Sequence, residues 1–225
     1  MARMMQRHFE QELESLKTNL IKMGSIVEEA VADSMKALMG RDTQLAQRII
    51  DRDDRINSLE IEIDNAIVDL LALQQPVAID LRLILAAQKI NNDLERIGDH
   101  AVNIAESAIA MVQTKDSFLK VPQMGELVQT MLRNAIDGFI HGDPSLGKSV
   151  LENDDVVDEL NRTMTQEVIQ LLNNNKMSIE GGIDLIRVSR NLERVADLAT
   201  NIAEEVIFMA QARVVKHNAE TKEGA

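Results

Sequence analysis

The sequence contains no cysteine, no tryptophan and no tyrosine, and only four of its 225 residues are phenylalanine. Without cysteine there is no disulfide, no thiolate nucleophile and no cysteine-ligated zinc or iron–sulfur site, so the chain is compatible with a reducing cytoplasm. Strands draw heavily on aromatic and β-branched residues, and single-stranded nucleic acid is commonly held by stacking on exposed rings. The composition therefore argues against an all-β fold and against this mode of nucleic-acid recognition.

Positive charge is also scarce. The 24 Lys and Arg residues face 37 Asp and Glu residues, which gives a net charge of −13, and this excess argues against contact with a phosphate backbone. Residues 1–14 lack the apolar segment of a signal peptide. The densest apolar stretch, Leu81–Ala87, is interrupted by Arg82 and is far shorter than the roughly 20 residues of a transmembrane helix. We expect a cytoplasmic protein with no nucleic-acid partner.

Glycine and proline are few, with ten and three residues, and between them apolar residues recur at helical spacing. Interruptions occur where a residue that favours a helix end is followed by one that favours a helix start. They fall at Gly40–Asp42, Gln74–Pro76, Thr114–Pro122, His141–Pro144 and Asn173–Asn175. These interruptions predict six helices, each of roughly 25 to 35 residues.

An internal repeat predicts how the helices are grouped. The segment LERIGDHAVNIAE at 94–106 matches LERVADLATNIAE at 192–204 in nine of 13 positions, with an offset of 98 residues. Further upstream, Asp53 matches Asp154 with an offset of 101. We predict an all-α protein of two tandem three-helix bundles related by internal duplication. The expected divisions are 1–113, 114–213 and a flexible C-terminal tail at 214–225.

Acidic residues gather on one face of the third helix expected in each half. An advance of 100° per residue places Glu95, Asp99 and Asn103 within roughly 80° of one another, opposite an apolar stripe. The same geometry holds for the equivalent residues of the second half. Carboxylate pairs with a spacing of four also lie on the first two helices, where Asp53 shares the face of Glu60. The candidate ligands are Glu29, Asp33, Glu60, Asp64, Glu95, Asp99, Asn103, Glu193, Asp197 and Asn201.

Carboxylates that converge from neighbouring helices repel one another, and a multivalent cation would relieve that repulsion. A set of oxygen ligands favours a hard or intermediate ion. A ferritin-like di-iron centre is excluded, because it needs Glu-x-x-His and none of the four histidines has a glutamate three residues before it. The alternative interpretation is a solvated acidic surface opposite the apolar stripe, and the periodicity alone leaves both open.

The two halves differ in their acidic residues. Asn134, Asn161 and Thr165 stand where the first half has Asp33, Glu60 and Asp64. We therefore expect the first-half site to carry more charge. Asp137, Asp154 and Asp158 are candidates to compensate in the second half.

Gly142–Ser149 matches the phosphate-loop pattern G-x-x-x-x-G-K-S. That loop needs a preceding strand, whereas here a helix precedes it. Asp143 and Pro144 fit a helix cap and first turn. We therefore expect this segment to start a helix and not to bind a nucleotide.

The residues now support a resemblance to the PhoU family of phosphate-uptake regulators. The segment QPVAIDLR at 75–82, the two LER-(I/V)-x-D segments at 94 and 192, and the helix beginning near Phe9 carry it, and it covers about residues 5–213. The resemblance implies two three-helix bundles and a cytoplasmic, membrane-peripheral homodimer. It also implies surface clusters of iron, magnesium, manganese, calcium or zinc held by the E/D-x-x-x-D motifs listed above.

The function implied by the resemblance is negative regulation of phosphate uptake and of phosphate-starvation signalling. The protein would link the ATPase of the phosphate ABC transporter to the sensor kinase PhoR, as an adaptor and not as an enzyme. Nothing in the sequence pairs a nucleophile with a base, which agrees with that expectation. Two alternatives stay open: a metal-dependent phosphohydrolase that uses metal-bound hydroxide, and a metal-free helical scaffold whose acids serve solubility.

Overall fold

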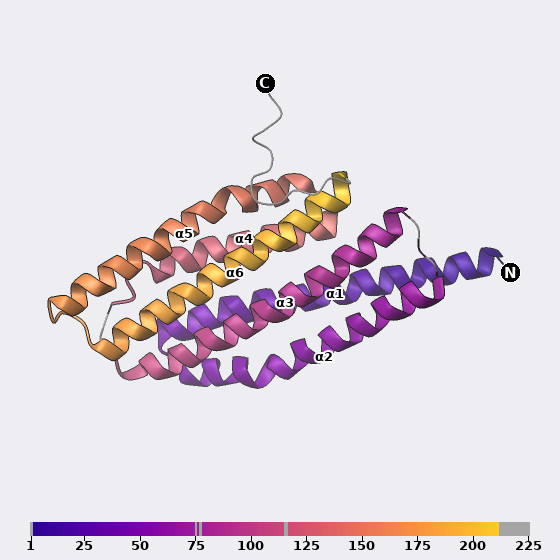
Figure 1. Ribbon diagram of the computed structural model, residues 1–225. Coiled ribbons are helices and arrows are strands. Elements are labelled where there is room, and N and C mark those ends of the chain that lie inside the picture. The colour runs from indigo at the N-terminus through magenta and orange to yellow at the C-terminus, as the bar shows by residue number, and fades with distance from the viewer. Residues whose placement is uncertain (1, 75, 77, 115–116, 212–225) are drawn as a thin grey trace, which may run out of the picture.

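The computed structural model describes residues 2–74, 76, 78–114 and 117–211, and within these residues it contains six α-helices and no strand (Figure 1). The predicted all-α class is confirmed. The helices are α1 (Ala2–Gly40), α2 (Thr43–Gln74), α3 (Ala78–Ala110), α4 (Val121–His141), α5 (Pro144–Asn173) and α6 (Ile179–Gln211), with a 3-10 turn, Met111–Gln113, after α3. At 39 residues α1 is longer than predicted, and at 21 residues α4 is shorter.

Local capping chemistry sets the helix ends near the predicted interruptions. Asp42 Oδ1 accepts hydrogen bonds from the backbone N–H groups of Gln44 and Leu45, which satisfies donors that the first turn of α2 leaves free. Gly142 closes α4 in the left-handed conformation, with a φ of 62°, which glycine adopts without steric cost. Asp143 then caps α5 by accepting from Ser145 N at 2.9 Å.

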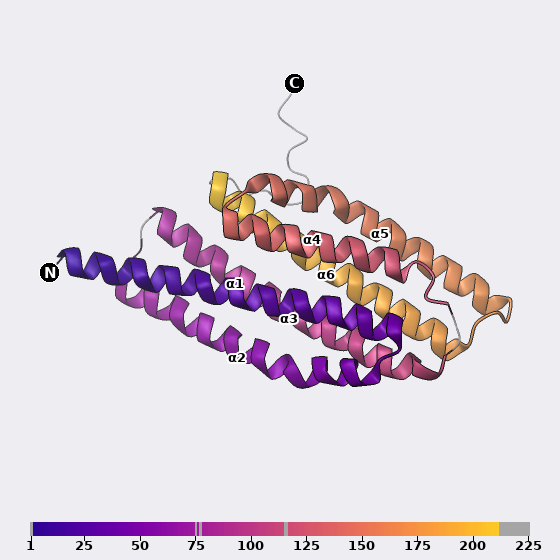
Figure 2. The ribbon, with the colours of Figure 1, turned by 180° about the vertical axis from the view of Figure 1, so that it is seen from behind.

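The two bundles lie side by side, with α3 and α6 at the centre (Figures 1 and 2). Helices α1–α3 form one bundle and α4–α6 the other. Lys89 pairs with Glu205 at one end of the α3–α6 seam, and Arg187 pairs with Glu106 at the other. Higher numbers on α3 therefore meet lower numbers on α6, so these two helices run antiparallel.

One apolar core runs through both halves. The stripe predicted for α3 is buried, as Leu94 and Ile104 show with exposed fractions of 1% and 0%. On α6 the equivalent Leu192 and Ile202 are fully buried as well. Because α3 and α6 each pack both within their own bundle and against each other, they are buried on two sides.

The predicted tail, 214–225, lies outside the described residues. None of the helices described is long and apolar enough to cross a membrane.

Candidate metal-binding faces

The carboxylate of Asp53 on α2 lies against α3 beside Gly98. A Cβ built at position 98 would lie 3.7 Å from Asp53 Oδ1 and 2.9 Å from Ile56 Cδ1, so the missing side chain lets α2 approach α3. Asn57 Nδ2 donates to Asp53 Oδ2 at 3.0 Å. Among the described residues, Asp53 Oδ1 has no hydrogen-bond partner although it is buried. A buried and unsatisfied carboxylate oxygen is costly, and a cation is one partner that would satisfy it.

Four carboxylates of the first half act on one another electrostatically. Burial raises the pKa of Asp53, and the negative charge of Asp99 raises it further. Burial also raises the pKa of Glu95, and repulsion from Asp99, Glu60 and Asp53 adds to the effect. These directions mean that the ionised forms are disfavoured where the carboxylates meet. We call Asp53, Glu60, Glu95 and Asp99 the α2–α3 acidic face.

The predicted pair on α1 shares a pocket with Asp53. Glu29 and Asp33 line the same small pocket as Asp53, with a volume of about 40 Å³. Arg52 Nη1 lies 3.7 Å from Glu29 Oε1, and Lys36 Nζ lies 2.8 Å from Asp33 Oδ1. Basic side chains therefore partly neutralise the α1 pair.

Asp64 does not join the α2–α3 acidic face as a free ligand. Its Oδ1 accepts hydrogen bonds from Gln88 Nε2 and from Asn91 Nδ2, both at 2.9 Å. Asp64 therefore ties α2 to α3.

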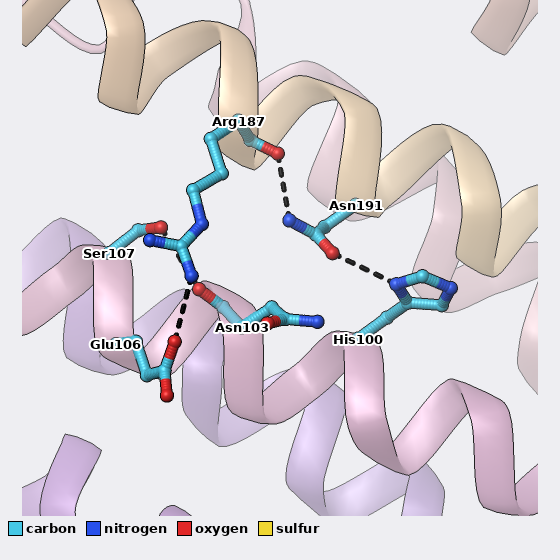
Figure 3. Close-up of polar contacts among 6 residues, drawn as sticks. All are labelled: His100, Asn103, Glu106, Ser107, Arg187 and Asn191. Atoms are coloured by element: carbon cyan, nitrogen blue, oxygen red, sulfur yellow. Dashed lines mark hydrogen bonds and ion pairs between the residues drawn. The ribbon is translucent and has the colours of Figure 1, made fainter.

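The two predicted asparagines face the seam between the halves. Asn103 lies near His100 and Arg187, where α3 meets α6 (Figure 3). Asn201 on α6 lines the same pocket as Asp93 on α3, and its side chain partly offsets the rise that burial causes in the pKa of Asp93. Both asparagines therefore lie where the two bundles meet and not on an acidic face.

The second half has its own face, made by Asp154 and Asp158 on α5 and by Glu193 and Asp197 on α6. Burial raises the pKa of Asp154, Asp158 and Glu193, and in each case the charge of Asp197 is the next cause. Arg194 Nη1 partly offsets that charge by lying 3.0 Å from Asp197 Oδ2. We call these four residues the α5–α6 acidic face.

The residues that replace the missing acids of the second half form internal hydrogen bonds. Ser189 Oγ donates to Asn161 Oδ1, and Asn134 Nδ2 donates to Ser149 Oγ. Asp154 and Asp158 extend the face, as the sequence allowed. Asp53 was absent from the candidate ligands, although its place on the face of Glu60 and its offset of 101 from Asp154 were the signals that could have added it.

The carboxylates do not form a complete metal-coordination site by themselves. Among the residues described, no group of three or more Asp, Glu or His side chains is arranged so that it could hold one ion. Magnesium commonly takes only one or two protein carboxylates and keeps several waters. Two carboxylates from either face, completed by water or by oxygen atoms of a partner, are thus the arrangement that these residues fit.

The phosphate-loop pattern forms the junction between α4 and α5 instead of an anion cradle. Gly147 lies inside α5, where a Cβ would come 3.0 Å from the backbone oxygen of Ala203 on α6. The glycine is therefore explained by close helix packing, and Lys148 lies exposed on the helix.

Comparisons with known proteins agree with this architecture. The family model for the PhoU domain matches twice, at residues 20–108 and 121–206. The chain belongs to the PhoU family. It is 38% identical over 214 residues to a phosphate-specific transport system accessory protein PhoU homolog of Pseudomonas aeruginosa, covering 94% of this chain and 88% of that one. A homolog of the same name from Clostridium acetobutylicum is 34% identical, with 96% and 100% covered.

Solved PhoU structures share the fold. The crystal structure of PhoU from Pseudomonas aeruginosa matches with a TM-score of 0.88 and 37% identity, covering 91% of this chain and all of that one. The phosphate transport system regulatory protein PhoU from Streptococcus pneumoniae matches with a TM-score of 0.87 and 29% identity, covering 93% of this chain and all of that one. The two tandem three-helix bundles predicted from the repeat are thereby confirmed.

Proposed function

We propose that this protein regulates phosphate uptake by docking onto other proteins and not by catalysis. The observation that carries the proposal is the pair of PhoU domains that fill most of the chain, in a family whose full-length relatives are named accessory proteins of the phosphate-specific transport system. The helices also supply a rigid body with long exposed faces, a form suited to docking.

The finer role follows from the family resemblance. The protein is a cytoplasmic homodimer that inhibits phosphate uptake and phosphate-starvation signalling when phosphate is plentiful. It does so by linking the transporter ATPase to the sensor kinase PhoR, and it meets the membrane only through these partners.

His100 forms a contact across the seam between the two bundles. His100 Nδ1 lies 2.8 Å from the amide oxygen of Asn191 (Figure 3). His100 is thus employed in joining α3 to α6.

The adaptor role is tested by co-precipitation of the purified protein with the transporter ATPase and with the cytoplasmic part of PhoR, each alone and then together. We expect binding to each, and a three-component complex that forms only when this protein is present. Binding to neither partner would contradict the proposal.

We further propose that the two acidic faces bind metal ions, each ion held by two carboxylates, drawn from Asp53, Glu95 and Asp99 in the first half and from Asp154, Glu193 and Asp197 in the second. The orphaned Oδ1 of Asp53 and the raised carboxyl pKa values support it. A bound cation would neutralise the faces and offer open coordination positions to partner oxygens. Glu29 and Asp33, which line the same pocket as Asp53, are the residues that would extend the first site.

Elemental analysis of purified protein for iron, magnesium, manganese, calcium and zinc tests the metal sites. We expect Glu95→Gln/Asp99→Asn to lose more metal than Glu193→Gln/Asp197→Asn, because the first half keeps more carboxylates. Asp64→Asn is the matched control, since Asp64 serves Gln88 and Asn91, and it should keep its metal. Equal metal content in wild type and the three variants would contradict metal binding at the two acidic faces.

A further inference from the structure

The hairpin of α2 and α3 exposes an unusual number of large apolar side chains. Of the 13 large apolar residues that the described chain exposes, seven fall between positions 61 and 85. Val68 is 61% exposed and Ile79 is 71% exposed. Single exposed apolar residues are ordinary, but a concentrated patch marks an interaction surface.

Five of these residues share one side of the hairpin: an advance of 100° per residue places Ile61, Val68 and Leu71 within about 80° of one another on α2, and Leu81 and Leu85 within about 40° on α3. Asp64 on α2 forms a hydrogen bond with Gln88 on α3. Leu71 lies two helical turns after Asp64, and Leu81 lies two helical turns before Gln88, so these two leucines also face the contact between α2 and α3. Val68 and Leu85 flank them on the outer surface. We call these five exposed residues the α2–α3 apolar strip: Ile61, Val68, Leu71, Leu81 and Leu85.

The central part of the strip recurs in the second half. Val68, Leu71, Leu81 and Leu85 correspond, by the offsets of 101 and 98, to Ile169, Leu172, Ile179 and Ile183. Three of these four counterparts are exposed, and Leu172 is half-buried. Solubility alone gives no reason to keep exposed aliphatic residues at equivalent places in both halves, whereas a docking role does.

The charge around the two strips differs, and this difference identifies the occupant. Positions 61–85 hold four acids and one base, a net charge of −3, made by Glu62, Asp64, Asp69, Asp80 and Arg82. The corresponding positions 162–183 hold two acids and two bases, Glu167, Glu180, Arg162 and Lys176. An apolar strip with an acidic rim complements an apolar stripe with basic flanks.

We propose that the α2–α3 apolar strip is a docking surface for an amphipathic helix of a partner protein, whose apolar stripe is bordered by Lys and Arg. From Ile61 to Leu71 the strip runs about 15 Å along α2, which is the length of about three turns of such a helix. The acidic rim does not complement the same strip of a second copy, which carries the same acids, or an anionic membrane. The proposal deepens the adaptor role, on which it rests for the partner's identity.

The probe is a fluorescent 18-residue peptide of Leu and Lys, with Leu at the helical spacing i, i+3, i+4 and i+7. Its binding to the full chain is measured by anisotropy at physiological salt. We expect Val68→Ser/Leu85→Ser to weaken binding about tenfold. The matched control, Ile169→Ser/Ile183→Ser, changes the equivalent residues of the second half, where acids and bases balance, and should weaken peptide binding far less.

The contribution of charge is tested by Glu62→Gln/Asp69→Asn, which should weaken binding and flatten its salt dependence. Glu126→Gln/Glu152→Gln removes two exposed charges elsewhere and is the control for net charge. The proposal is overturned if wild type does not bind the peptide or if a peptide of scrambled order binds equally well. It is also overturned if Val68→Ser/Leu85→Ser and Ile169→Ser/Ile183→Ser weaken peptide binding to the same extent.

Two other occupants are distinguished by their own measurements. Concentration-dependent sedimentation that Val68→Ser/Leu85→Ser abolishes would make the occupant a second copy, and binding to anionic vesicles lost in the same variant would make it a membrane. Either result overturns the proposed partner. If the transporter ATPase and PhoR bind wild type and this variant equally, the surface is wrong while the adaptor role stands. If they bind neither protein, the adaptor role fails, and the peptide still tests the surface.

Discussion

Gly98 on α3 packs against Ile56 on α2 so closely that a Cβ at position 98 would come within 2.9 Å of Ile56 Cδ1. In the second half, Ala196 on α6 corresponds to Gly98, and Val157 on α5 corresponds to Ile56. One half thus has a glycine with an isoleucine, and the other an alanine with a valine. The two pairs have the same total number of side-chain carbon atoms, so the volume of the contact is the same in both halves.

This exchange predicts coupling between the two positions. Ile56→Val alone should cost about 1 kcal/mol, since it deletes a buried methylene. In the Gly98→Ala background the same change should cost close to nothing, because the added Cβ takes up the space. Urea unfolding of the four proteins measures the coupling. Gly40→Ala, whose Cβ would meet nothing within 4 Å, should show no coupling to Ile56→Val. An equal cost in both backgrounds would contradict the exchange.

Asp93 should make stability depend on pH. Burial raises its pKa from 3.8 to about 6, against the opposing effect of Arg96. A carboxyl whose pKa is higher in the folded state stabilises the fold below the unfolded pKa, and this stability is lost as the pH rises through the folded pKa. The free energy of unfolding should thus fall by up to about 3 kcal/mol between pH 4 and 7 on account of this group.

The measurement is the free energy of unfolding from pH 3.5 to 8 in the presence of a chelator. Asp93→Asn should flatten the decline above pH 4, and the exposed Asp69→Asn should leave it in place. A decline of the same size in Asp93→Asn and wild type would show that other groups cause it.

Metal binding at the acidic faces should appear as thermal stabilisation. A ligand at 100 times its Kd adds about 2.7 kcal/mol, which raises the Tm of a chain of this size by about 5–10 °C. Without metal, Glu95→Gln/Asp99→Asn should melt above wild type, because it removes repulsion within the α2–α3 acidic face. With manganese or magnesium its Tm should rise less than that of wild type. Asp64→Asn, which leaves the face intact, should respond as wild type does.

The two ion pairs of the α3–α6 seam should differ in strength. Lys89 Nζ lies 2.5 Å from Glu205 Oε1, and Glu205 is 9% exposed, whereas Arg187 and Glu106 are both about half exposed. Lys89→Gln leaves a buried carboxylate without its cation and should cost about 1–3 kcal/mol. Arg187→Gln should cost less than about 1 kcal/mol, as exposed pairs do. Urea midpoints give both values, and equal losses would mean that Glu205 is no more buried in solution than Glu106.

Much of the fold could be predicted because its signals are local. Asp42, Gly142 and Asp143 end or start helices through bonds to their immediate neighbours, so their residue types reveal the boundary. The repeat between 94–106 and 192–204 likewise revealed the two bundles. The side-by-side arrangement could not be predicted, since a helical wheel gives the apolar face of a helix without naming what covers it.

The same limit explains the site. Glu95 and Asp99 point to the outer face of their bundle, and the spacing of four residues placed them together correctly. Asn103 and Asn201 continue the same spacing, but α3 and α6 are covered on two sides, and one further turn carries these residues to the seam. Asp53 was placed beside Asp99 by the close approach at Gly98, a contact between helices that no single-helix pattern contains.

The antiparallel seam of α3 and α6 relates two similar halves as a two-fold axis relates the subunits of a dimer. Here the two halves share one chain. Assembly of this internal dimer is therefore a first-order event, and the effective concentration of one half near the other is set by the connection between α3 and α4. The seam should consequently form equally well however scarce the protein is in the cell.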